Sequence, residues 1–379
     1  MTALHLISGR GPTGAAAAAI NDILSLRAAG IRACAACRHD APAIRDALLH
    51  AGVPSNDIFA EFNFGRGALG MLTTLRDATL LSRIANLQSI DTIHVHRASE
   101  HWLSLLIPGR NRRAKLVRTW HRSPLCEHRP ILSTLAGHTA GCVCVAREHE
   151  ALLLGAGAPR ARFIHAAVDT AFFQPTWRDR PGPEKLPIHP VIIGQAARWK
   201  RERGRDRGQR FTLDIFSKLS PALAWRGELV GRGEMERELT ARAFSELRLP
   251  PERVAIVSTQ GKSAAKFAAI LGGLDVGLVF CVGSDGGSRP ALEMLACGVP
   301  LLVSDTPGLR ELADDSECAR VVLRGGVDEW VRAIEALLRE PERLKSMRAA
   351  ARKRAETTHS FRARGEALAQ FYRECAQER

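Results

Sequence analysis

The sequence lacks long apolar runs and is poor in aromatic residues. No stretch of its 379 residues approaches the roughly 20 apolar residues that a membrane-spanning helix needs. The first residues, MTALHLISGRG, carry neither the basic leader nor the apolar segment of a signal peptide. Aromatic residues make up 5% of the chain, with a single tyrosine, and no recognised nucleic-acid-binding module is present. We therefore expect a cytoplasmic protein that does not cross a membrane and has no nucleic-acid partner.

The cysteines argue against two further classes of protein. There are nine, an odd number, and the sequence lacks the repeated CxxC motifs of a zinc ribbon. Their scattered positions also disfavour a disulfide scaffold. We expect reduced thiols that are mainly buried.

The chain is strongly basic. It has 54 lysines and arginines against 40 acidic residues, a net charge of +14. Such a surface suits polyanions, anionic membrane faces or phosphorylated small molecules, and charge alone does not choose among them.

Short apolar runs alternate with helical patterns along the chain. Residues 4–8, 92–96 and 115–120 have the pattern of strands, and residues 15–30 that of a helix. This alternation is typical of a parallel sheet with helices on both faces. The pattern stops in a stretch rich in proline and charge and then resumes. We therefore predict two doubly wound domains.

The predicted boundaries follow from these changes of pattern. Residues 1–173 form an N-terminal domain, 174–190 a linker and 191–358 a C-terminal domain. Residues 359–379 form a last helix, for which packing against the N-terminal domain is one option.

The segment SDGGSRPALEMLACG (284–298) joins two predicted strands, 276–282 and 300–304. Ser288 can cap the helix, and Pro290 suits its first turn. The free amides and the positive end of the helix dipole favour an anion such as phosphate. Ligands of open α/β sheets bind beyond the carboxyl ends of the strands, where this glycine-rich turn is expected.

Glu293 is the one charged residue of the apolar part of this helix. A buried carboxylate must find hydrogen-bond donors or cost several kcal/mol. Sugar or ribose hydroxyls are one source of donors, and a nearby arginine is another. The chemistry of the residues leaves both open.

The segment beginning at Asp285, DGGSRPALEMLACGVP, resembles the E-x7-E segment of GT-B retaining glycosyltransferases, in particular family GT4 (glycosyl transferases group 1). The family pattern is roughly E-G-F-G-x-x-x-L-E-A-M-A-x-G-x-P. Other segments resemble family motifs in the same order: HVH (94–96), VRTWH (117–121), VDTAFFQP (168–175), ARW (197–199) and ELVGRGEMERELT (228–240). The resemblance covers most of the chain. It implies a GT-B fold, an α/β architecture of two Rossmann-like parallel-sheet domains facing a central cleft.

The resemblance assigns the donor contacts of the C-terminal domain. Glu293 would bind the ribose of a nucleotide-sugar donor, and Asp285, one methylene shorter than the family glutamate, would contact the transferred sugar. The amides of Gly286, Gly287 and Ser288 would hold sugar hydroxyls or phosphate.

The resemblance also places a cationic clamp on the diphosphate. Arg198 matches the family arginine. Arg203 and Arg207 are alternatives for the family lysine, because the loop between 200 and 210 is longer than in the family. His121 corresponds to the histidine of the N-terminal domain that faces the donor sugar or phosphate.

The implied reaction is transfer of a sugar from a nucleotide-diphosphate sugar to a saccharide or glycolipid, with retention of anomeric configuration. The sequence has no Asp-x-Asp motif. We therefore expect no metal and no cofactor, with arginine and amide groups stabilising the leaving diphosphate. A sugar-nucleotide epimerase and a non-catalytic nucleotide-sugar-binding protein are the alternatives.

The acceptor side is expected in the N-terminal domain. The loop GRGPTG (9–14) offers Arg10, Gly11 and Gly14 near the expected cleft, and RNRRAKLVR (110–118) is densely basic. Peripheral contact with an anionic membrane that carries a lipid-linked acceptor in envelope polysaccharide or lipopolysaccharide assembly explains both. A solvated basic surface is the alternative.

Overall fold

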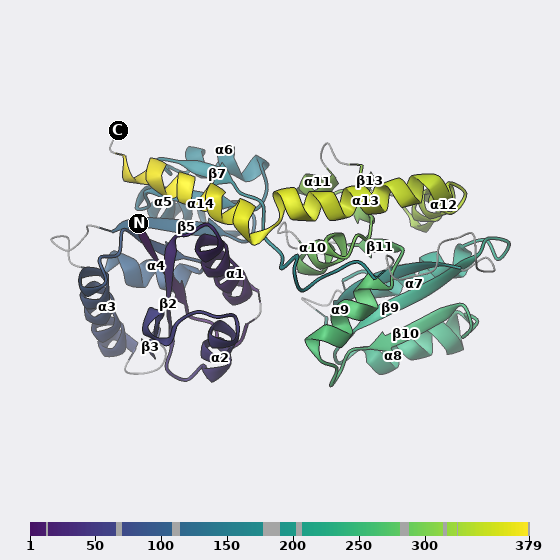
Figure 1. The fold of residues 1–379 in the computed structure, drawn as a ribbon, viewed down its shortest axis with the longest axis horizontal. Coiled ribbons are helices and arrows are strands. Elements are labelled where there is room, and N and C mark those ends of the chain that lie inside the picture. Colours follow the sequence, from purple (N-terminus) through teal and green to yellow (C-terminus); the bar gives the residue numbers. More distant parts are fainter. Residues whose placement is uncertain are drawn as a thin grey trace. The chain divides into compact units, whose positions relative to one another are not determined.

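The computed structural model describes residues 1–12, 14–65, 70–107, 114–176, 190–201, 207–280, 288–313, 317–323 and 325–377. The chain divides into two compact units (Figure 1). The first combines Met1–Ala167 with Thr358–Arg379, and the second is Val168–Thr357. Most of the predicted linker lies outside the described residues.

The first unit contains a seven-stranded parallel sheet with the order β3-β2-β1-β4-β5-β6-β7. Its strands are β1 (Thr2–Ile7), β2 (Arg32–Arg38), β3 (Ile58–Phe62), β4 (Thr92–Val95), β5 (Lys115–Trp120), β6 (Gly141–Cys144) and β7 (Ala161–Phe163). Its α-helices are α1 (Ala15–Ala28), α2 (Pro42–His50), α3 (Gly70–Leu87), α4 (Ala98–Leu105), α5 (Arg129–Gly137), α6 (Glu148–Gly155) and α14 (Phe361–Ala376).

Alternate residues of β1 pack against helices on opposite faces of this sheet. Ala3 and Ile7 belong to the core formed with α1, α2 and α14. Leu4 and Leu6 belong to the core formed with α3 and α4. Successive side chains of a strand point to opposite faces, so a strand that is apolar throughout is buried on both sides, as the sequence predicts.

The second unit contains a six-stranded parallel sheet with the order β10-β9-β8-β11-β12-β13. Its strands are β8 (Val191–Arg198), β9 (Trp225–Arg232), β10 (Val254–Ser258), β11 (Val276–Val279), β12 (Leu301–Ser304) and β13 (Ala319–Val322). Its α-helices are α7 (Gln209–Lys218), α8 (Glu236–Ala241), α9 (Ala264–Gly272), α10 (Arg289–Ala296), α11 (Pro307–Ala313), α12 (Val327–Leu338) and α13 (Pro341–Thr358). A π-helical turn, Arg242–Glu246, follows α8.

Two cores cover the faces of the second sheet. One face packs against α9, α10 and α11, and the other against α7, α8 and α12. Residues of β12 alternate between the two, since Leu301 and Val303 belong to the first core and Leu302 to the second. The predicted doubly wound arrangement of both sheets is thereby confirmed.

Helix α14, from the C-terminal end of the chain, is part of the first unit. Its Arg364 donates to both carboxylate oxygens of Asp22 on α1, at 2.5 and 3.1 Å. The same guanidinium donates to the main-chain oxygens of Ile164 and His165. Both partners of the ion pair are buried. Such a pair fixes α14 to α1, because separating the partners would leave an uncompensated buried charge.

We expect Gly365→Ala to destabilise the first unit by about 2 kcal/mol. Gly365 lies where α14 crosses α1, and an added Cβ would collide with the main-chain oxygen of Ser25. Gly155, the last residue of α6, has open space at the corresponding position, so Gly155→Ala is the matched control. Urea denaturation of both variants measures the difference. Equal stability of the two variants would contradict the close approach of α14 to α1.

The described cysteines are unpaired, and all of them except Cys126 are buried. In the part of the chain that the structure describes, no helix is both long enough and apolar enough to span a bilayer.

Candidate functional site

The strand order of the second unit reverses between β8 and β11. From β8 the chain continues outward to β9 and β10 on one side, and from β11 to β12 and β13 on the other. A crevice forms at such a reversal, beyond the carboxyl ends of the two strands. Arg198 is the last residue of β8. The turn after β11, with the predicted Asp285, Gly286 and Gly287, lies outside the described residues.

Arg198 is an exposed cation at this strand end. Its main-chain oxygen accepts a hydrogen bond from Gln209 Nε2 at 2.8 Å, which ties the strand end to the start of α7. Within the described ranges, the Arg198 guanidinium has no ion-pair or hydrogen-bond partner. The main chain at Arg198 is thus held, and no described residue pairs with its charged group.

The start of α7 lies against the end of β11. Gly208 begins the helix with φ +86°, a left-handed conformation that favours glycine, and an added Cβ would meet the ring of Phe280. Arg207 is held through its main chain, since its amide donates to Gln209 and its carbonyl accepts from Gln195. Arg203, the alternative for the same role, lies outside the described residues. The structure therefore places Arg207 beside the strand reversal and leaves the choice between the two arginines open.

Helix α10 is the short buried helix that the sequence predicts. Ser288 occupies the N-cap position and Pro290 lies in the first turn. The Ser288 side chain makes no capping hydrogen bond. From Ala291 to Ala296 every residue is buried.

Glu293 is 4% exposed and pairs with an arginine of its own helix. Arg289 Nε donates to Glu293 Oε1 at 2.8 Å. Burial raises the pKa of the Glu293 carboxyl, and Arg289 partly opposes that shift. Among the described residues, Oε2 accepts no hydrogen bond. One carboxylate oxygen is therefore held by Arg289, and no described residue donates to the other.

The pairing with Arg289 is one of the two alternatives left open by the sequence. Its signal was present there, because Arg289 precedes Glu293 by four residues, the spacing that brings side chains together on a helix. Arg289 itself was not among the predicted site residues. Its side chain is 63% exposed, so the pair leaves the guanidinium in contact with solvent.

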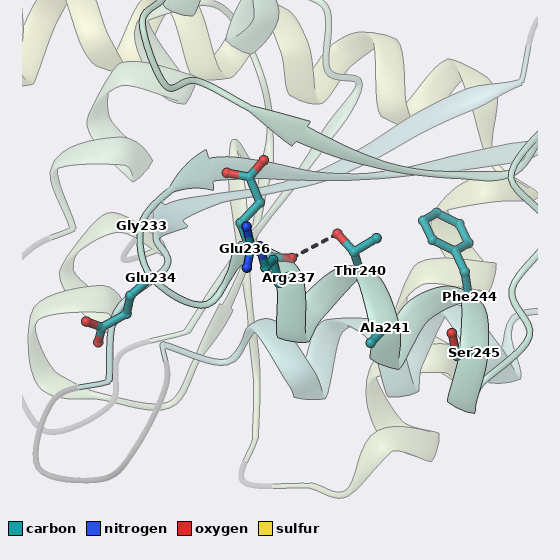
Figure 2. A pocket seen from close by; sticks show the side chains of 8 residues that line it. All are labelled: Gly233, Glu234, Glu236, Arg237, Thr240, Ala241, Phe244 and Ser245. Atoms are coloured by element: carbon teal, nitrogen blue, oxygen red, sulfur yellow. Dashed lines mark hydrogen bonds between the residues drawn. The ribbon is translucent and has the colours of Figure 1, made fainter.

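A separate hollow of about 730 Å³ opens beside α8. Figure 2 shows its walls, which come from the turn after β9, from α8 and from the π-helical turn. Its lining residues are Gly233, Glu234, Glu236, Arg237, Thr240, Ala241, Phe244 and Ser245. Thr240 Oγ1 donates to the main-chain oxygen of Glu236 at 2.8 Å. Arg198 and Glu293 are not among these residues, so the hollow is distinct from the predicted donor contacts.

In the first unit the strand order reverses between β1 and β4. His121, half-buried, follows β5, and its Nε2 lies 3.0 Å from Nδ1 of His96, which follows β4. Burial lowers the pKa of His121 to about 4, so the ring is neutral at pH 7. The predicted donor-facing histidine therefore stands at the carboxyl edge of this sheet.

The predicted loop residues lie at the carboxyl end of β1. Gly14 is the N-cap of α1 with φ +56°, where only glycine is unstrained. Arg10 is exposed and pairs with Asp40 at 3.1 Å. Gly11 has open space around the position of a Cβ. A ligand anion would therefore compete with Asp40 for Arg10. Asp40 lies thirty residues further along the chain, so the sequence of the loop does not reveal this ion pair.

Glu100 is a buried carboxylate that the sequence analysis missed. One of its oxygens accepts from the amide and hydroxyl of Ser8, and the other from the amides of His96 and Arg97. Four donors satisfy the charge and hold the ends of β1 and β4 together. The sequence held one indication of this role, because a glutamate as third residue of a helix, here α4, is typical of a capping box.

Buried histidines lie below this edge. Ligand atoms of His5, Asp22, His94 and His96 lie within 4.8 Å of one another. Most of these atoms already have hydrogen-bond partners: His94 contacts Thr119 and Tyr372, and Asp22 contacts Arg364. A metal ion would have to displace these partners and would lie beside a buried guanidinium. The cluster therefore fits a hydrogen-bonded core better than a metal site.

Each unit is a doubly wound parallel sheet with a strand-order reversal, the architecture expected of the two domains of a GT-B fold. The GT-B glycosyltransferase resemblance and the α/β fold class predicted from the sequence are confirmed, and assignment to family GT4 stays a prediction.

Comparisons with known proteins agree with this class. A family model described as "Glycosyl transferase-like" matches residues 245–370, which include α10. An MMP alpha-(1->4)-mannosyltransferase of Mycolicibacterium hassiacum is 27% identical over 192 residues. That alignment covers 47% of the chain and 46% of the mannosyltransferase, so it spans about half of that relative's length.

Solved structures of other proteins resemble the fold of this chain over both units. A glycosyltransferase from Rickettsia africae has a TM-score of 0.76 at 16% identity, covering 100% of this chain and 99% of that one. HepE from Anabaena, solved in complex with UDP, has a TM-score of 0.74 at 17% identity, covering 98% and 99%. At this level of identity the likeness shows the fold alone.

Proposed function

We propose that the protein is a glycosyltransferase that moves a sugar from a nucleotide-diphosphate sugar to a saccharide or glycolipid acceptor, with retention of configuration. The observation that carries this proposal is Glu293, whose carboxylate is buried on α10 with one oxygen held by Arg289 and none of the described residues donating to the other. The match of the family model to residues 245–370 supports it.

Arg198 and the start of α10 are assigned to the diphosphate. Departure of a nucleoside diphosphate builds negative charge on phosphate oxygens, and fixed donors at that place lower the barrier without reorganising. A guanidinium can hold two phosphate oxygens at once, and the amides at a helix start favour an anion. Arg207 or Arg203 would add a second cation.

Glu293 is assigned to the ribose, whose hydroxyls would donate to Oε2. Asp285 is assigned to the transferred sugar, and the amides of Gly286, Gly287 and Ser288 to sugar hydroxyls or phosphate. In the first unit, His121 is assigned to the donor sugar or phosphate. Attack from the face that the diphosphate leaves needs no protein nucleophile, so retention requires only that these groups hold the leaving group close. We propose that no metal is needed.

Turnover of UDP-, GDP- and ADP-sugars by the whole chain, with and without a chelator, tests this function. We expect release of nucleoside diphosphate from at least one donor at a rate that the chelator does not change. Conversion of the sugar without release of diphosphate would indicate the epimerase alternative. Binding without any turnover would indicate a nucleotide-sugar-binding protein, and loss of turnover with chelator would refute metal independence.

We propose further that the first unit touches an anionic membrane that carries the acceptor. Helix α3 supports this, because Met71, Leu72 and Leu75 are 80%, 65% and 53% exposed. Arg76 and Arg83 are exposed on the same helix, while its acidic residue Asp77 is buried. Exposed apolar and cationic side chains together suit the surface of an anionic bilayer. Of the basic run 110–118, residues 110–113 lie outside the described part.

We expect the protein to sediment with anionic liposomes at low salt and to be released at high salt, because lipid headgroups attract cations through a screened field. Leu72→Glu should lower the bound fraction several-fold. Leu154, 49% exposed on α6, offers the control Leu154→Glu. Absence of binding at low salt, or equal loss in both variants, would remove the membrane proposal.

A further inference from the structure

Three histidines form one hydrogen-bonded line in the first unit: His5 lies within β1, and His96 and His121 directly follow β4 and β5. His5 Nδ1 lies 3.1 Å from His96 Nε2, and His96 Nδ1 lies 3.0 Å from His121 Nε2. The rings of successive members stack, with centroids 5.4 and 5.3 Å apart. Both nitrogens of the central ring are therefore committed to its neighbours.

In each of the two nitrogen–nitrogen contacts of this line, one ring nitrogen carries a proton and the other accepts it. Burial keeps the rings neutral, since it lowers the pKa of His5 and of His121 to about 4 and holds the pKa of His96 well below its ordinary value. A neutral imidazole has one donor and one acceptor nitrogen. If His96 donates through Nδ1, it must accept through Nε2 from His5. The tautomers of the three rings therefore change together.

The inner end of the line favours one of the two arrangements. His5 is fully buried, and its Nε2 has no hydrogen-bond partner among the described residues. A buried N–H without an acceptor is rarer than a buried acceptor without a donor. We therefore place the His5 proton on Nδ1, where His96 accepts it.

The charged groups around the line do not supply the missing acceptor. Asp22 faces the rings of His5 and His121, but its two oxygens accept from Arg364 of α14. Arg364, Arg118 and Arg97 also face His121, and cations favour its neutral form. His94, tilted against His5, has its own partners in Thr119 and Tyr372.

We propose that His96 is a positioning residue that fixes His121 as the tautomer with its proton on Nδ1. His121 Nε2 then accepts from His96, and Nδ1–H remains as a neutral donor. In the described part of the chain, His121 Nδ1 has no hydrogen-bond partner. The residue is half-buried, so this donor can meet a ligand.

The chemistry of the ligand follows from the tautomer. Phosphate oxygens only accept hydrogen bonds, so the opposite tautomer would direct a lone pair at them. A fixed Nδ1–H suits a phosphate or a sugar oxygen and brings no additional charge. This deepens the proposed function and rests on it only for the ligand, because the tautomer itself is a property of the free protein.

Long-range ¹H–¹⁵N correlation spectra of histidine-labelled protein test the proposal directly. Signals that disappear in His121→Ala identify His121. We expect its Nδ1 to carry the proton in the wild type and the proton to move at least partly to Nε2 in His96→Leu. A wild-type proton on Nε2, or the same tautomer in both proteins, would overturn the proposal.

The variant His96→Asn separates positioning from structure. An asparagine amide can donate from near the place of His96 Nδ1, so His121 should keep its proton on Nδ1. Turnover of the accepted donor should fall about tenfold in His96→Leu, the worth of one hydrogen bond, and recover in His96→Asn. If His96→Asn folds but its His121 does not keep the proton on Nδ1, the proposal is overturned. If His96→Leu does not fold, the position of the His121 proton in the wild-type spectrum decides the question.

The same experiments give a different pattern of results if the proposed function, rather than the tautomer proposal, is wrong. If the tautomers respond as expected while turnover is unchanged, the positioning by His96 stands and the assignment of His121 to the donor is wrong.

Discussion

Arg198→Ala should lower kcat of donor turnover about 10²- to 10³-fold, the range seen when a donor to developing charge is removed. Arg198 ends β8 at the strand-order reversal, and its guanidinium has no partner among the described residues. Among the described residues there is therefore no ion pair whose loss would explain the effect. Arg198→Lys should recover part of the rate, because charge remains while the two-oxygen geometry is lost.

Glu293→Gln should act differently, raising KM about 10- to 100-fold with a smaller change in kcat. Ribose is held equally in the ground state and the transition state, and loss of such uniform binding appears in KM. The expected rise in KM corresponds to the free energy that hydrogen bonds to a charged group contribute to binding.

Two variants serve as controls for this pair. Arg320, exposed on β13, offers Arg320→Ala. Glu335 pairs with Arg339 at i,i+4, as Glu293 does with Arg289, and offers Glu335→Gln. Steady-state kinetics with the accepted donor measures all four variants. Unchanged kinetics in both Arg198→Ala and Glu293→Gln would show that the donor site is misplaced.

Mild acid should unfold the first unit before the second. Burial lowers the pKa of His5 to about 4, of His101 to about 3 and of His121 to about 4. His94 and His96 shift in the same direction. In the described part of the second unit there is no histidine.

The sign follows from proton binding. Between pH 6.5, the ordinary pKa of histidine, and about 4 the unfolded chain binds protons that the folded unit does not, so the stability of the folded unit decreases as the pH is lowered. Each fully buried histidine contributes about 1.4 kcal/mol per pH unit over this window. His121 is half-buried and contributes less. Above pH 6.5 the effect is absent. The contribution of His5 levels off below about pH 4, and that of His101 below about pH 3.

Hydrogen exchange with mass spectrometry, followed from pH 7 to pH 5 with correction for intrinsic exchange, resolves the two units. Peptides of β1, β4 and β5 should lose protection far more steeply than peptides of β8, β11 and β12. Parallel loss in both units, or earlier loss in the second, would contradict the proposed origin of the acid sensitivity.

Local patterns predicted the two sheets well, because a strand buried on both faces is recognisable in one short segment. Strand 115–120 and the helix after Ser288 are where the sequence places them. Strand β3, Ile58–Phe62, was missed; its first three residues are only partly buried, Glu61 is exposed and Phe62 is buried. Its pattern is correspondingly weak.

Contacts between distant segments could not be predicted in the same way. Arg364 and Asp22 are 342 residues apart, and His5 and His96 are 91 apart. This protein has many arginines and lysines, and the packing of whole helices decides which of them pairs with a given carboxylate. Arg289 is the exception, because its spacing from Glu293 is local and predicts the pair.

The central claim is that the second unit binds a nucleoside diphosphate through Glu293 and Arg198. Calorimetric titration of UDP, GDP and ADP into the wild type, Glu293→Gln and Glu335→Gln measures this without any acceptor. We predict one site per chain for at least one nucleotide, with affinity lowered about 10- to 100-fold in Glu293→Gln and unchanged in Glu335→Gln. Equal affinity in all three proteins, or no binding to the wild type, would contradict the account.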